Sequence, residues 1–336
     1  MHAVFRADAS PAIGGGHVMR CLTLAGALAE AGWTCAFAAR PGTVDAVPAL
    51  ARWGNEVVTL EGGADDEPGA MKRLWPEGAD WLIVDHYGLD AAFEAACRPW
   101  ARKVMVIDDL ADRPHDCEVL LDQNLGRGNA DYSALVPKGC GMLLGPHFAL
   151  LRSQFGAARS SALERRANGG ELSRIMVSMG ATDPNGVTVK VLEGIGFSGV
   201  GAAIDVVVPA DARGDVEKAA HGLPLRVHSD VADMAALMSR ADLAVGGAGS
   251  TSWERCCLGL PSLLIVTADN QRAIADELES AGAARVLGWH GDVDPGRISR
   301  ALADISADGD GRRRMGEAAA RLCDGQGSHR IRERLS

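Results

Sequence analysis

The chain has 336 residues, 47% of them hydrophobic and 23% charged, so it can bury a sizeable core, and its length favours two domains over one. Its formal net charge of -10 is spread along the sequence, which argues against nucleic acid as a partner because phosphate binding needs a basic face. Eight cysteines without CxxC spacing indicate buried, reduced thiols. We find no signal peptide before the first strand and no apolar run of membrane-spanning length, so we expect a cytoplasmic protein with no membrane partner.

Short apolar runs rich in Val, Ile and Leu alternate with helix-period segments along the whole chain. In the first half they start near residues 3, 81, 103, 118 and 141. In the second half they start near residues 174, 202, 224, 242, 262 and 284. Runs that are buried on both faces and alternate with helices predict parallel sheets built from βαβ units. The predicted fold class is therefore α/β, with two doubly wound, Rossmann-like domains.

The polar, small and charged stretch 152–173, which ends in a Gly-Gly pair, predicts the domain boundary. We expect an N-terminal domain over 1–155, a linker over 156–173 and a C-terminal domain over 174–336, whose last helices could pack back on the first domain. Two such domains imply a cleft that the carboxyl ends of both sets of strands face. Chemistry is therefore expected in the loops that directly follow strands.

A glycine loop after the first strand, Gly14 to Gly16, stands directly before His17 and an apolar helical pattern. Bare backbone lets a ligand approach closely, and His17 would point from the first helical turn. The spacing is not GxGxxG, no acidic residue ends the second strand, and the P-loop Lys is missing, so NAD and P-loop chemistry are not expected. Whether His17 acts on a ligand or only caps the helix stays open at this point.

A second glycine loop lies within 241–266, where a strand runs into a helix. Its glycines and helix-start residues are Gly247, Gly249, Ser250 and Thr251. Free N–H groups and the positive end of the helix dipole favour a diphosphate there, and Glu254 could accept hydrogen bonds from a ribose diol. The alternative is a glycine-capped helix without a ligand. A similar strand-to-helix loop through Gly180 favours the phosphate interpretation.

Polar residues also end the strands of the first half. They are Asp85, His86, Tyr87, Asp108, Asp109, Asp122, Gln123 and Asn124. Adjacent carboxylates suit a divalent metal, but the Asp108–Asp109 pair can equally cap a helix or pair with Arg113, so we expect no metal. His86 and His115 rival His17 as a base, and Tyr87 could orient a sugar or a water.

Seven motifs, in order over residues 5 to 285, carry a family resemblance. They are RADASPAIGGGHVMRCLTLA, VDHYGLD, IDDLADRPHDC, LLDQNLG, GPHFALLRSQF, SMGATDPNG and GGAGSTSWERCCLGLPSLLIVTADNQ. Together they resemble the UDP-2,4-diacetamido-2,4,6-trideoxy-β-L-altropyranose hydrolases of pseudaminic acid biosynthesis. The resemblance implies a GT-B-like fold, UDP held mainly by the C-terminal domain, and hydrolysis of a UDP-sugar at the anomeric carbon with inversion and without a cofactor.

The resemblance also implies roles for particular residues. The proposed catalytic histidine falls on His17, with the sugar approaching Gly14, Gly15 and Gly16 and with Asp85 and Tyr87 beside it. The UDP loop falls on Gly247, Gly249, Ser250 and Thr251, with Glu254 at the ribose, and Asn270 and Gln271 match a pair near the diphosphate and sugar. Ala181 stands where a second glycine is expected, and Gln154 where an acidic residue is common, so the fit to a particular sugar stays open.

Two other functions stay compatible with the sequence. One is a glycosyltransferase that passes a UDP-activated sugar to an acceptor, and the other is a UDP-sugar binding protein without catalysis. The first would be nearly inert without its acceptor, and the second would not need His17. A monomer is compatible with the sequence, which does not determine the oligomeric state.

Overall fold

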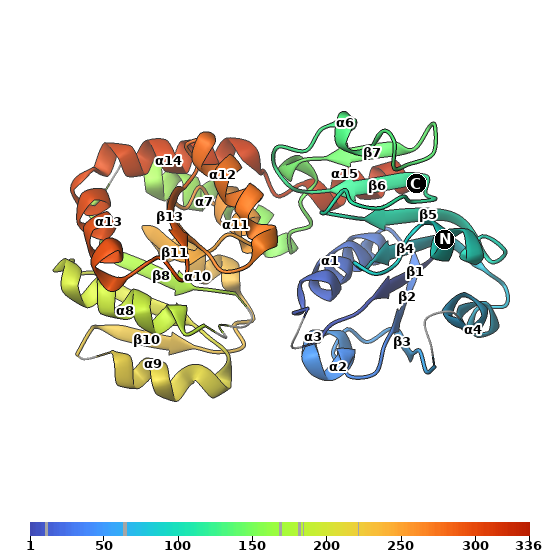
Figure 1. Cartoon of the computed structure of the whole chain (residues 1–336), viewed down its shortest axis with the longest axis horizontal. Helices are drawn as coiled ribbons and strands as arrows, with labels where there is room; N and C mark the ends of the chain where they lie inside the picture. Colours follow the sequence, from blue (N-terminus) through green and yellow to red (C-terminus); the bar gives the residue numbers. More distant parts are fainter. Residues whose placement is uncertain (11–12, 63–65, 168–169, 181–182, 184, 221) are drawn as a thin grey trace. The chain divides into compact units, whose positions relative to one another are not determined.

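A computed structural model describes residues 1–10, 13–62, 66–167, 170–180, 183, 185–220 and 222–336 (Figure 1). The chain divides into two compact units. Unit 1 comprises Met1–Leu150 and Gln326–Ser336, and unit 2 comprises Leu151–Gly325. Among the described residues, no helix is both long and apolar enough to span a bilayer.

Unit 1 is built on a seven-stranded parallel sheet in the order β3-β2-β1-β4-β5-β6-β7. Its strands are β1 His2–Ala7, β2 Thr34–Ala39, β3 Glu56–Thr59, β4 Ala79–Asp85, β5 Ala101–Ile107, β6 Val119–Asp122 and β7 Gly141–Leu144. Its helices are α1 Gly16–Glu30, α2 Thr43–Ala46, α3 Pro48–Ala51, α4 Glu67–Leu74, α5 Ala91–Cys97, α6 Asn129–Tyr132, the short η2 Pro146–Phe148, and α15 Gly327–Leu335.

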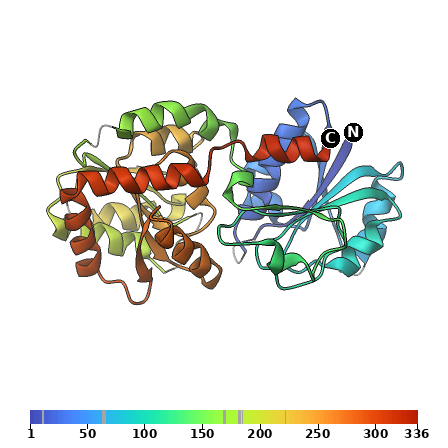
Figure 2. The same ribbon diagram turned by 90° about the horizontal axis from the view of Figure 1, so that it is seen from above.

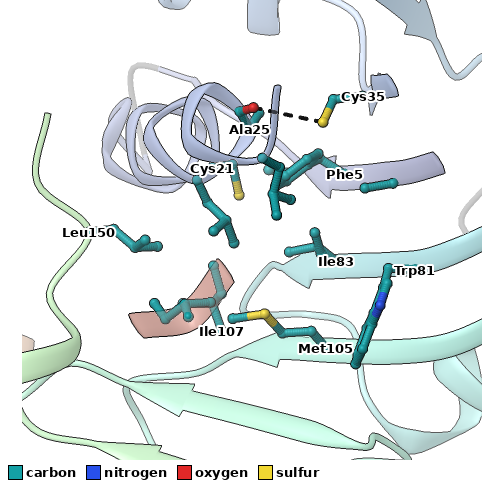
Figure 3. Close-up of a cluster of buried hydrophobic side chains, with 14 of the residues drawn as sticks. Phe5, Cys21, Ala25, Cys35, Trp81, Ile83, Met105, Ile107 and Leu150 are labelled. Carbon is teal, nitrogen blue, oxygen red and sulfur yellow. Dashed lines mark hydrogen bonds between the residues drawn. The ribbon is translucent and has the colours of Figure 1, made fainter. Parts of the chain in front are cut away.

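Helices bury both faces of this sheet, because successive residues of each strand point to opposite sides. Phe5 packs in one core together with residues of α1 and α15, whereas its neighbour Val4 packs in the other with residues of α4 and α5. On the α1 face, Phe5 stacks on Phe37 with ring centroids 4.9 Å apart, and Cys21 lies among the apolar side chains (Figure 3). All eight cysteines are free and all but Cys140 are buried, which confirms the expected reduced thiols.

Unit 2 is built on a six-stranded parallel sheet in the order β10-β9-β8-β11-β12-β13. Its strands are β8 Arg174–Ser178, β9 Ala203–Val207, β10 Leu225–His228, β11 Leu243–Gly247, β12 Ser262–Val266 and β13 Arg285–Trp289. Its helices are α7 Ser153–Ala167, α8 Val187–Ser198, η3 Ala210–Ala212, α9 Arg213–Ala219, α10 Met234–Arg240, α11 Thr251–Cys257, η4 Asp269–Gln271, α12 Arg272–Ser280, α13 Pro295–Ala307 and α14 Gly309–Leu322.

Every predicted strand is present, but β2 and β3 were not predicted. The sequence of β2, TCAFAA, consists mostly of Ala and Cys, which have little preference for strands, although most of it is buried beside β1. The sequence of β3, EVVT, is short and lies at the sheet edge, where its side chains are only partly buried. Neither strand therefore shows the long apolar run that marked the others.

The segment 156–173, expected to be a linker, lies mostly inside α7, which belongs to unit 2. The arginines that make this segment look like a linker bind backbone carbonyls at helix ends. Arg159 donates to Cys323 O at 2.9 Å and to Ala320 O at 2.8 Å, and Arg166 donates to Met238 O at 2.7 Å. The charged composition therefore serves helix packing.

The chain crosses between the units twice, near residues 150 and 325 (Figure 2). Of the two last helical stretches, α14 belongs to unit 2, where it packs on α11, and α15 belongs to unit 1, where it packs on α1. The indole of Trp81 in β4 donates to Leu335 O at 3.1 Å, which ties the end of the chain to the central sheet of unit 1.

The strand order of each sheet reverses once, between β1 and β4 in unit 1 and between β8 and β11 in unit 2. At such a switch point the neighbouring crossovers leave in opposite directions, so the carboxyl ends of the two strands are open to a ligand. In unit 1 these ends carry the loop before His17 and the loop after Asp85. In unit 2 they carry the loops through Gly180 and Gly247.

We expect two glycines of α8 to respond oppositely to alanine. A Cβ at Gly194 would lie 2.6 Å from Ile298 Cβ and 3.0 Å from Pro295 O, so Gly194→Ala forces α8 off α13 and lowers the free energy of unfolding by about 1–3 kcal/mol. Gly196 is exposed with nothing described near its Cβ position, so Gly196→Ala raises that free energy by about 0.5–1 kcal/mol. Urea denaturation of both variants checks this, and equal effects would contradict the packing.

Candidate active site

His17 and Asp85 form a buried pair at the switch point of unit 1. The strand register sets Asp85, the last residue of β4, beside Ala7, the last residue of β1, and α1 begins one residue before His17. His17 Nδ1 lies 2.5 Å from Asp85 Oδ1. A carboxylate only accepts hydrogen bonds, so Nδ1 carries a proton, and in the neutral tautomer with this proton Nε2 has the lone pair. Within the described part of the chain, no hydrogen bond reaches this Nε2.

Arg20, one turn further along α1, completes the cluster. It donates to both oxygens of Asp85 at 2.6 Å and to Asp109 at 3.0 Å. Burial alone would raise the pKa of Asp85, but the attraction of Arg20 and then of His17 outweighs it and holds that pKa well below its ordinary value. Tyr87 lies edge-on to the His17 ring, with centroids 4.5 Å apart. Asp85 therefore stays ionised and orients the imidazole.

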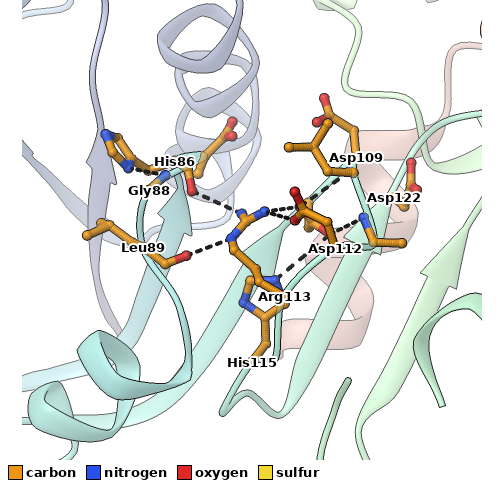
Figure 4. A network of polar contacts seen from close by, with 12 residues as sticks. His86, Gly88, Leu89, Asp109, Asp112, Arg113, His115 and Asp122 are labelled. Carbon is orange, nitrogen blue, oxygen red and sulfur yellow. Dashed lines mark hydrogen bonds and ion pairs between the residues drawn. The ribbon is translucent and has the colours of Figure 1, made fainter. Parts of the chain in front are cut away.

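His86 is committed elsewhere. Its Nδ1 accepts from Gly88 N at 2.9 Å, and its Nε2 lies 3.4 Å from Asp8 Oδ2 (Figure 4). Both ring nitrogens are therefore engaged, so His86 offers no free lone pair, unlike His17.

His115 is committed as well. Its side chain is wholly buried, with Nδ1 2.7 Å from Glu94 Oε1 and Nε2 3.9 Å from Asp108 Oδ2. Burial lowers the pKa of His115, but the two carboxylates outweigh burial and raise it to about 9. His115 is therefore a cation inside the fold at neutral pH and is not a base.

The other carboxylates at strand ends are bound by protein side chains. Asp108 pairs with Arg113 at 2.9 Å, and Arg113 also donates to the carbonyls of His86 and Leu89 (Figure 4). Asp122 accepts from Tyr132 at 2.9 Å, and burial raises its pKa to about 6. Across the described residues, no group of three or more His, Cys, Asp or Glu side chains is arranged to hold a metal ion.

Gln123 and Asn124 belong to the fold rather than to an open site. Gln123 accepts from Leu150 N at 3.1 Å, and the backbone N–H of Asn124 donates to Asp122 at 2.9 Å. The Gln123 side chain therefore ties β6 to the segment before α7, and the Asn124 backbone closes the turn after β6.

The loop before His17 leaves its backbone accessible. Gly14 N donates to Ser10 O at 2.8 Å, and no described heavy atom lies within 4 Å of the Cβ position at Gly14 or Gly16. Gly15 instead faces Val47, whose Cγ2 would lie 2.9 Å from its Cβ. No described side chain therefore fills the Cβ positions of Gly14 and Gly16, while Gly15 serves packing.

At the switch point of unit 2, the loops after β8, β11 and β12 meet. A Cβ at Gly247 would lie 3.0 Å from Met179 O, so the two neighbouring loops can approach only because this residue has no side chain. Gly180 follows in the β8 loop and is exposed, whereas Ala181 lies outside the described residues. Gln154, the other departure from the family pattern, accepts from Ala235 N at 3.2 Å and holds the start of α10.

Gln271 joins the β12 loop to the β11 loop. Its Oε1 accepts from Ala248 N at 3.3 Å and from the backbone N–H and hydroxyl of Thr267, both at 3.1 Å. The carbonyl end is thus fully used, whereas no described residue accepts a hydrogen bond from Nε2, which lies 3.7 Å from the Cβ position of Gly249. Asn270 is exposed beside it in η4. Gln271 therefore has a fixed position, and its amide hydrogens are not bound by any described residue.

Ser250 and Thr251 begin α11, with Ser250 at the N-cap position. In the described structure, no side-chain hydrogen bond from Ser250 caps the helix. Its backbone has helical dihedral angles, φ -55° and ψ -26°, instead of the extended ones that a capping side chain needs. The exposed hydroxyl is therefore left to solvent or a ligand.

Arg255 is a buried cation under this loop that sequence reasoning missed. It donates to Gly247 O at 2.6 Å and to Ser252 Oγ at 2.9 Å, and burial lowers its pKa to about 10. No ion pair to it is found among the described residues. By binding Gly247 O, Arg255 fixes the orientation of the peptide that precedes Ala248. A charged Glu-Arg pair inside an apolar helix was the signal that could have revealed it.

Glu254 is held by Arg152, whose Nη2 lies 3.2 Å from Glu254 Oε1. Its side chain is 17% exposed. Burial raises the pKa of Glu254, and the attraction of Arg152 opposes that rise. The expected ribose contact therefore requires Glu254 to use its second oxygen or to exchange Arg152 for the diol.

Comparison with solved structures identifies the fold. Over its whole length the chain is similar to MurG of Acinetobacter baumannii, with a TM-score of 0.72, 14% identity and 99% of each chain covered. Residues 214–331 match the glycosyltransferase family 28 C-terminal domain. The chain therefore has the two parallel-sheet α/β domains of the GT-B fold, as the sequence predicted.

Comparison with curated proteins finds relatives that match only part of this chain. The UDP-2,4-diacetamido-2,4,6-trideoxy-β-L-altropyranose hydrolase of Campylobacter jejuni is 26% identical over 57% of this chain and 64% of its own length. The spore coat polysaccharide biosynthesis protein SpsG of Bacillus subtilis is 27% identical over 43% of each. In both cases the match spans less than two thirds of the relative's length.

We expect His115 to make the free energy of unfolding fall as the pH becomes alkaline. Its folded-state pKa is raised to about 9, so its contribution is complete below the ordinary histidine value and is lost as pH rises through about 9. The loss of stability caused by His115→Gln should therefore shrink, on the order of 3 kcal/mol, between about pH 6 and pH 10. Urea denaturation at both pH values measures it. The surface variant His329→Gln is the control, and a loss that does not change with pH would contradict the buried ion pair.

Proposed function

We propose that this protein is a nucleotide-sugar hydrolase that acts on UDP-linked 2,4-diacetamido-2,4,6-trideoxy-β-L-altropyranose, a step of pseudaminic acid biosynthesis. The observation that carries the proposal is the buried His17–Asp85 pair, which leaves Nε2 of His17 unpaired among the described residues at the switch point of unit 1. The seven ordered motifs and the hydrolase relative from Campylobacter jejuni support the choice of substrate.

In the proposed reaction, His17 activates water. Nε2 accepts a proton from the water as its oxygen attacks the anomeric carbon from the face opposite UDP. The bond between that carbon and the diphosphate oxygen breaks, its electron pair leaves with UDP, and the free sugar has inverted configuration. Asp85 accepts the Nδ1 hydrogen bond throughout and stabilises the imidazolium that forms.

Unit 2 supplies the nucleotide site in this proposal. The diphosphate binds the loop from Gly247 to Thr251, where Ser250 and the amide of Gln271 hold uncommitted donors, and Glu254 binds the ribose. Preformed donors stabilise the charge that develops on the leaving diphosphate. The step therefore uses neither a cofactor nor a metal ion.

A glycosyltransferase that passes the UDP-activated sugar to an acceptor is the second candidate function. It is favoured by the match of residues 214–331 to a glycosyltransferase domain and by the likeness to MurG. In that case His17 would take its proton from an acceptor hydroxyl instead of from water.

The two candidates differ in what they need to turn over. We expect purified protein to release UDP from the diacetamido trideoxy altrose nucleotide with a chelator present and no acceptor added. Release that depends on an added acceptor would favour the transferase. Tight UDP binding without turnover of this or related UDP-sugars, with or without acceptors, would favour a binding protein.

We expect His17→Ala to lose turnover by at least 100-fold while binding UDP as the wild type does, because general bases typically contribute 10²–10⁴-fold. Steady-state kinetics and calorimetry measure the two quantities. His86→Ala, at a histidine whose ring nitrogens are both engaged, is the matched control and should lose much less activity. A fully active His17→Ala enzyme would remove His17 from the reaction.

We expect Glu254→Ala to weaken UDP binding by roughly 10- to 100-fold, since one hydrogen bond to a charged group contributes about 1.5–3 kcal/mol. The wild type should lose a similar factor with 2′-deoxy-UDP or 3′-deoxy-UDP. The variant should not distinguish UDP from the deoxy analogue to which the wild type is sensitive. Calorimetry on this cycle checks the ribose assignment, and fully additive losses would refute it.

A further inference from the structure

Unit 1 contains two histidines that place Nδ1 on a fully buried carboxylate. His17 lies 2.5 Å from Asp85, and His115 lies 2.7 Å from Glu94. Both carboxylate side chains are completely inaccessible to solvent. The two pairs therefore form a natural comparison within one sheet.

The pairs differ in what else binds the carboxylate. Glu94 receives only a backbone hydrogen bond besides His115, from Asp116 N, and the described residues place no guanidinium on it. A buried carboxylate without a counter-charge stabilises the imidazolium beside it, and a second carboxylate, Asp108, adds to this. The pKa of His115 is raised accordingly, to about 9, which would disable a general base at neutral pH.

Both oxygens of Asp85, by contrast, accept hydrogen bonds from the guanidinium of Arg20. Nε and Nη2 of Arg20 each donate at 2.6 Å, and Nη2 lies 3.2 Å from Nδ1 of His17. Since both nitrogens donate to the same oxygen of Asp85, the guanidinium stands beside the imidazole as a positive charge. It repels a second proton on His17 and cancels much of the field of Asp85.

The remaining groups around His17 do not replace this effect. On α1, Cys21 donates to Asp85 at 3.7 Å, and burial raises the pKa of its thiol, which stays neutral. From the loop after β4, Tyr87 presents its ring edge. From the loop after β5, Asp109 binds Nη1 of Arg20 on the side away from Asp85. Arg20 is therefore the cation closest to the pair.

We propose that Arg20 is a positioning residue that keeps His17 neutral, and thus able to accept a proton, by neutralising Asp85 and holding it in place. This inference rests on the proposed function for its catalytic meaning, although the proton affinity of His17 is a property of unit 1 alone. Two tasks that conflict in a simple histidine–aspartate pair are separated here. Asp85 orients the ring, and Arg20 offsets the negative charge of that carboxylate, which would otherwise favour a second proton on the imidazole.

The direct test is an NMR titration of the His17 imidazole in the full chain, with His17→Gln used to assign its signal. We expect Arg20→Gln to raise the proton affinity of His17 at least tenfold, which is one pH unit or more. Arg20→Lys, which keeps one charge without the two-pronged contact, should give a smaller rise and protects the test should the first variant not fold. An unchanged or lower affinity in either folded variant would overturn the proposal.

Arg6 offers a matched control. It is also buried in unit 1 and also bridges two carboxylates, with Nε 2.8 Å from Glu67 and Nη2 2.8 Å from Asp8. Arg6→Lys should cost stability without moving the His17 titration, because neither carboxylate touches His17. A shift as large as that of Arg20→Lys would mean that any loosening of unit 1 produces the effect, which would also overturn the proposal.

Activity supplies a second, separable measurement. In the profile of kcat against pH, the midpoint of the acidic limb should lie at a higher pH in Arg20→Lys, by the amount seen in the titration. KM should be nearly unchanged. A wild type that releases no UDP would refute the hydrolase and leave the NMR test of Arg20 intact. A titration shift without any movement of the acidic limb would refute the catalytic use of Arg20.

Discussion

The constraint from which the rest of this structure follows is the reversal of strand order in each parallel sheet. Crossovers leave β1 and β4 in opposite directions, as they do β8 and β11, so at these two places strand ends are not covered by a crossover helix. Such an opening exposes backbone donors and the first residues of helices. Polar side chains gather at both openings, while apolar residues fill the two faces of each sheet.

Each opening contains a buried charged side chain, and the partners of this side chain differ between the two units. In unit 1 a carboxylate, Asp85, is held between a guanidinium and an imidazole, so the cluster is compensated internally. In unit 2 a guanidinium, Arg255, lies under a glycine loop, and its partners among the described residues are a carbonyl and a hydroxyl. Burying an unpaired charge is costly.

The pattern of apolar runs was sufficient to predict both parallel sheets, because strands buried on both faces leave an unmistakable signal. It failed for β2 and β3, whose residues are small or half exposed, and for α7, whose arginines bind helix ends instead of solvent. Glycine loops also predicted where the strands at the two switch points give way to helices. Local composition was therefore informative wherever a feature depends on neighbours in the sequence.

The partners of the candidate base could not be predicted in the same way. Asp85 meets His17 across 68 positions of sequence because β1 and β4 are adjacent in register, and Arg20 reaches both only from the next turn of α1. The same limit explains why three histidines looked equivalent. Only their carboxylate and backbone partners distinguish His17 from the buried cation His115 and from the fully engaged His86.

The central claim is that water, activated by His17, attacks the sugar carbon and not the diphosphate. Turnover in water enriched in heavy oxygen, followed by mass spectrometry of both products, tests it most directly. The account predicts one labelled oxygen on the anomeric carbon of the released sugar and none in UDP. Label in the β-phosphate of UDP would contradict the account, because the nucleophile would then have been aimed at phosphorus.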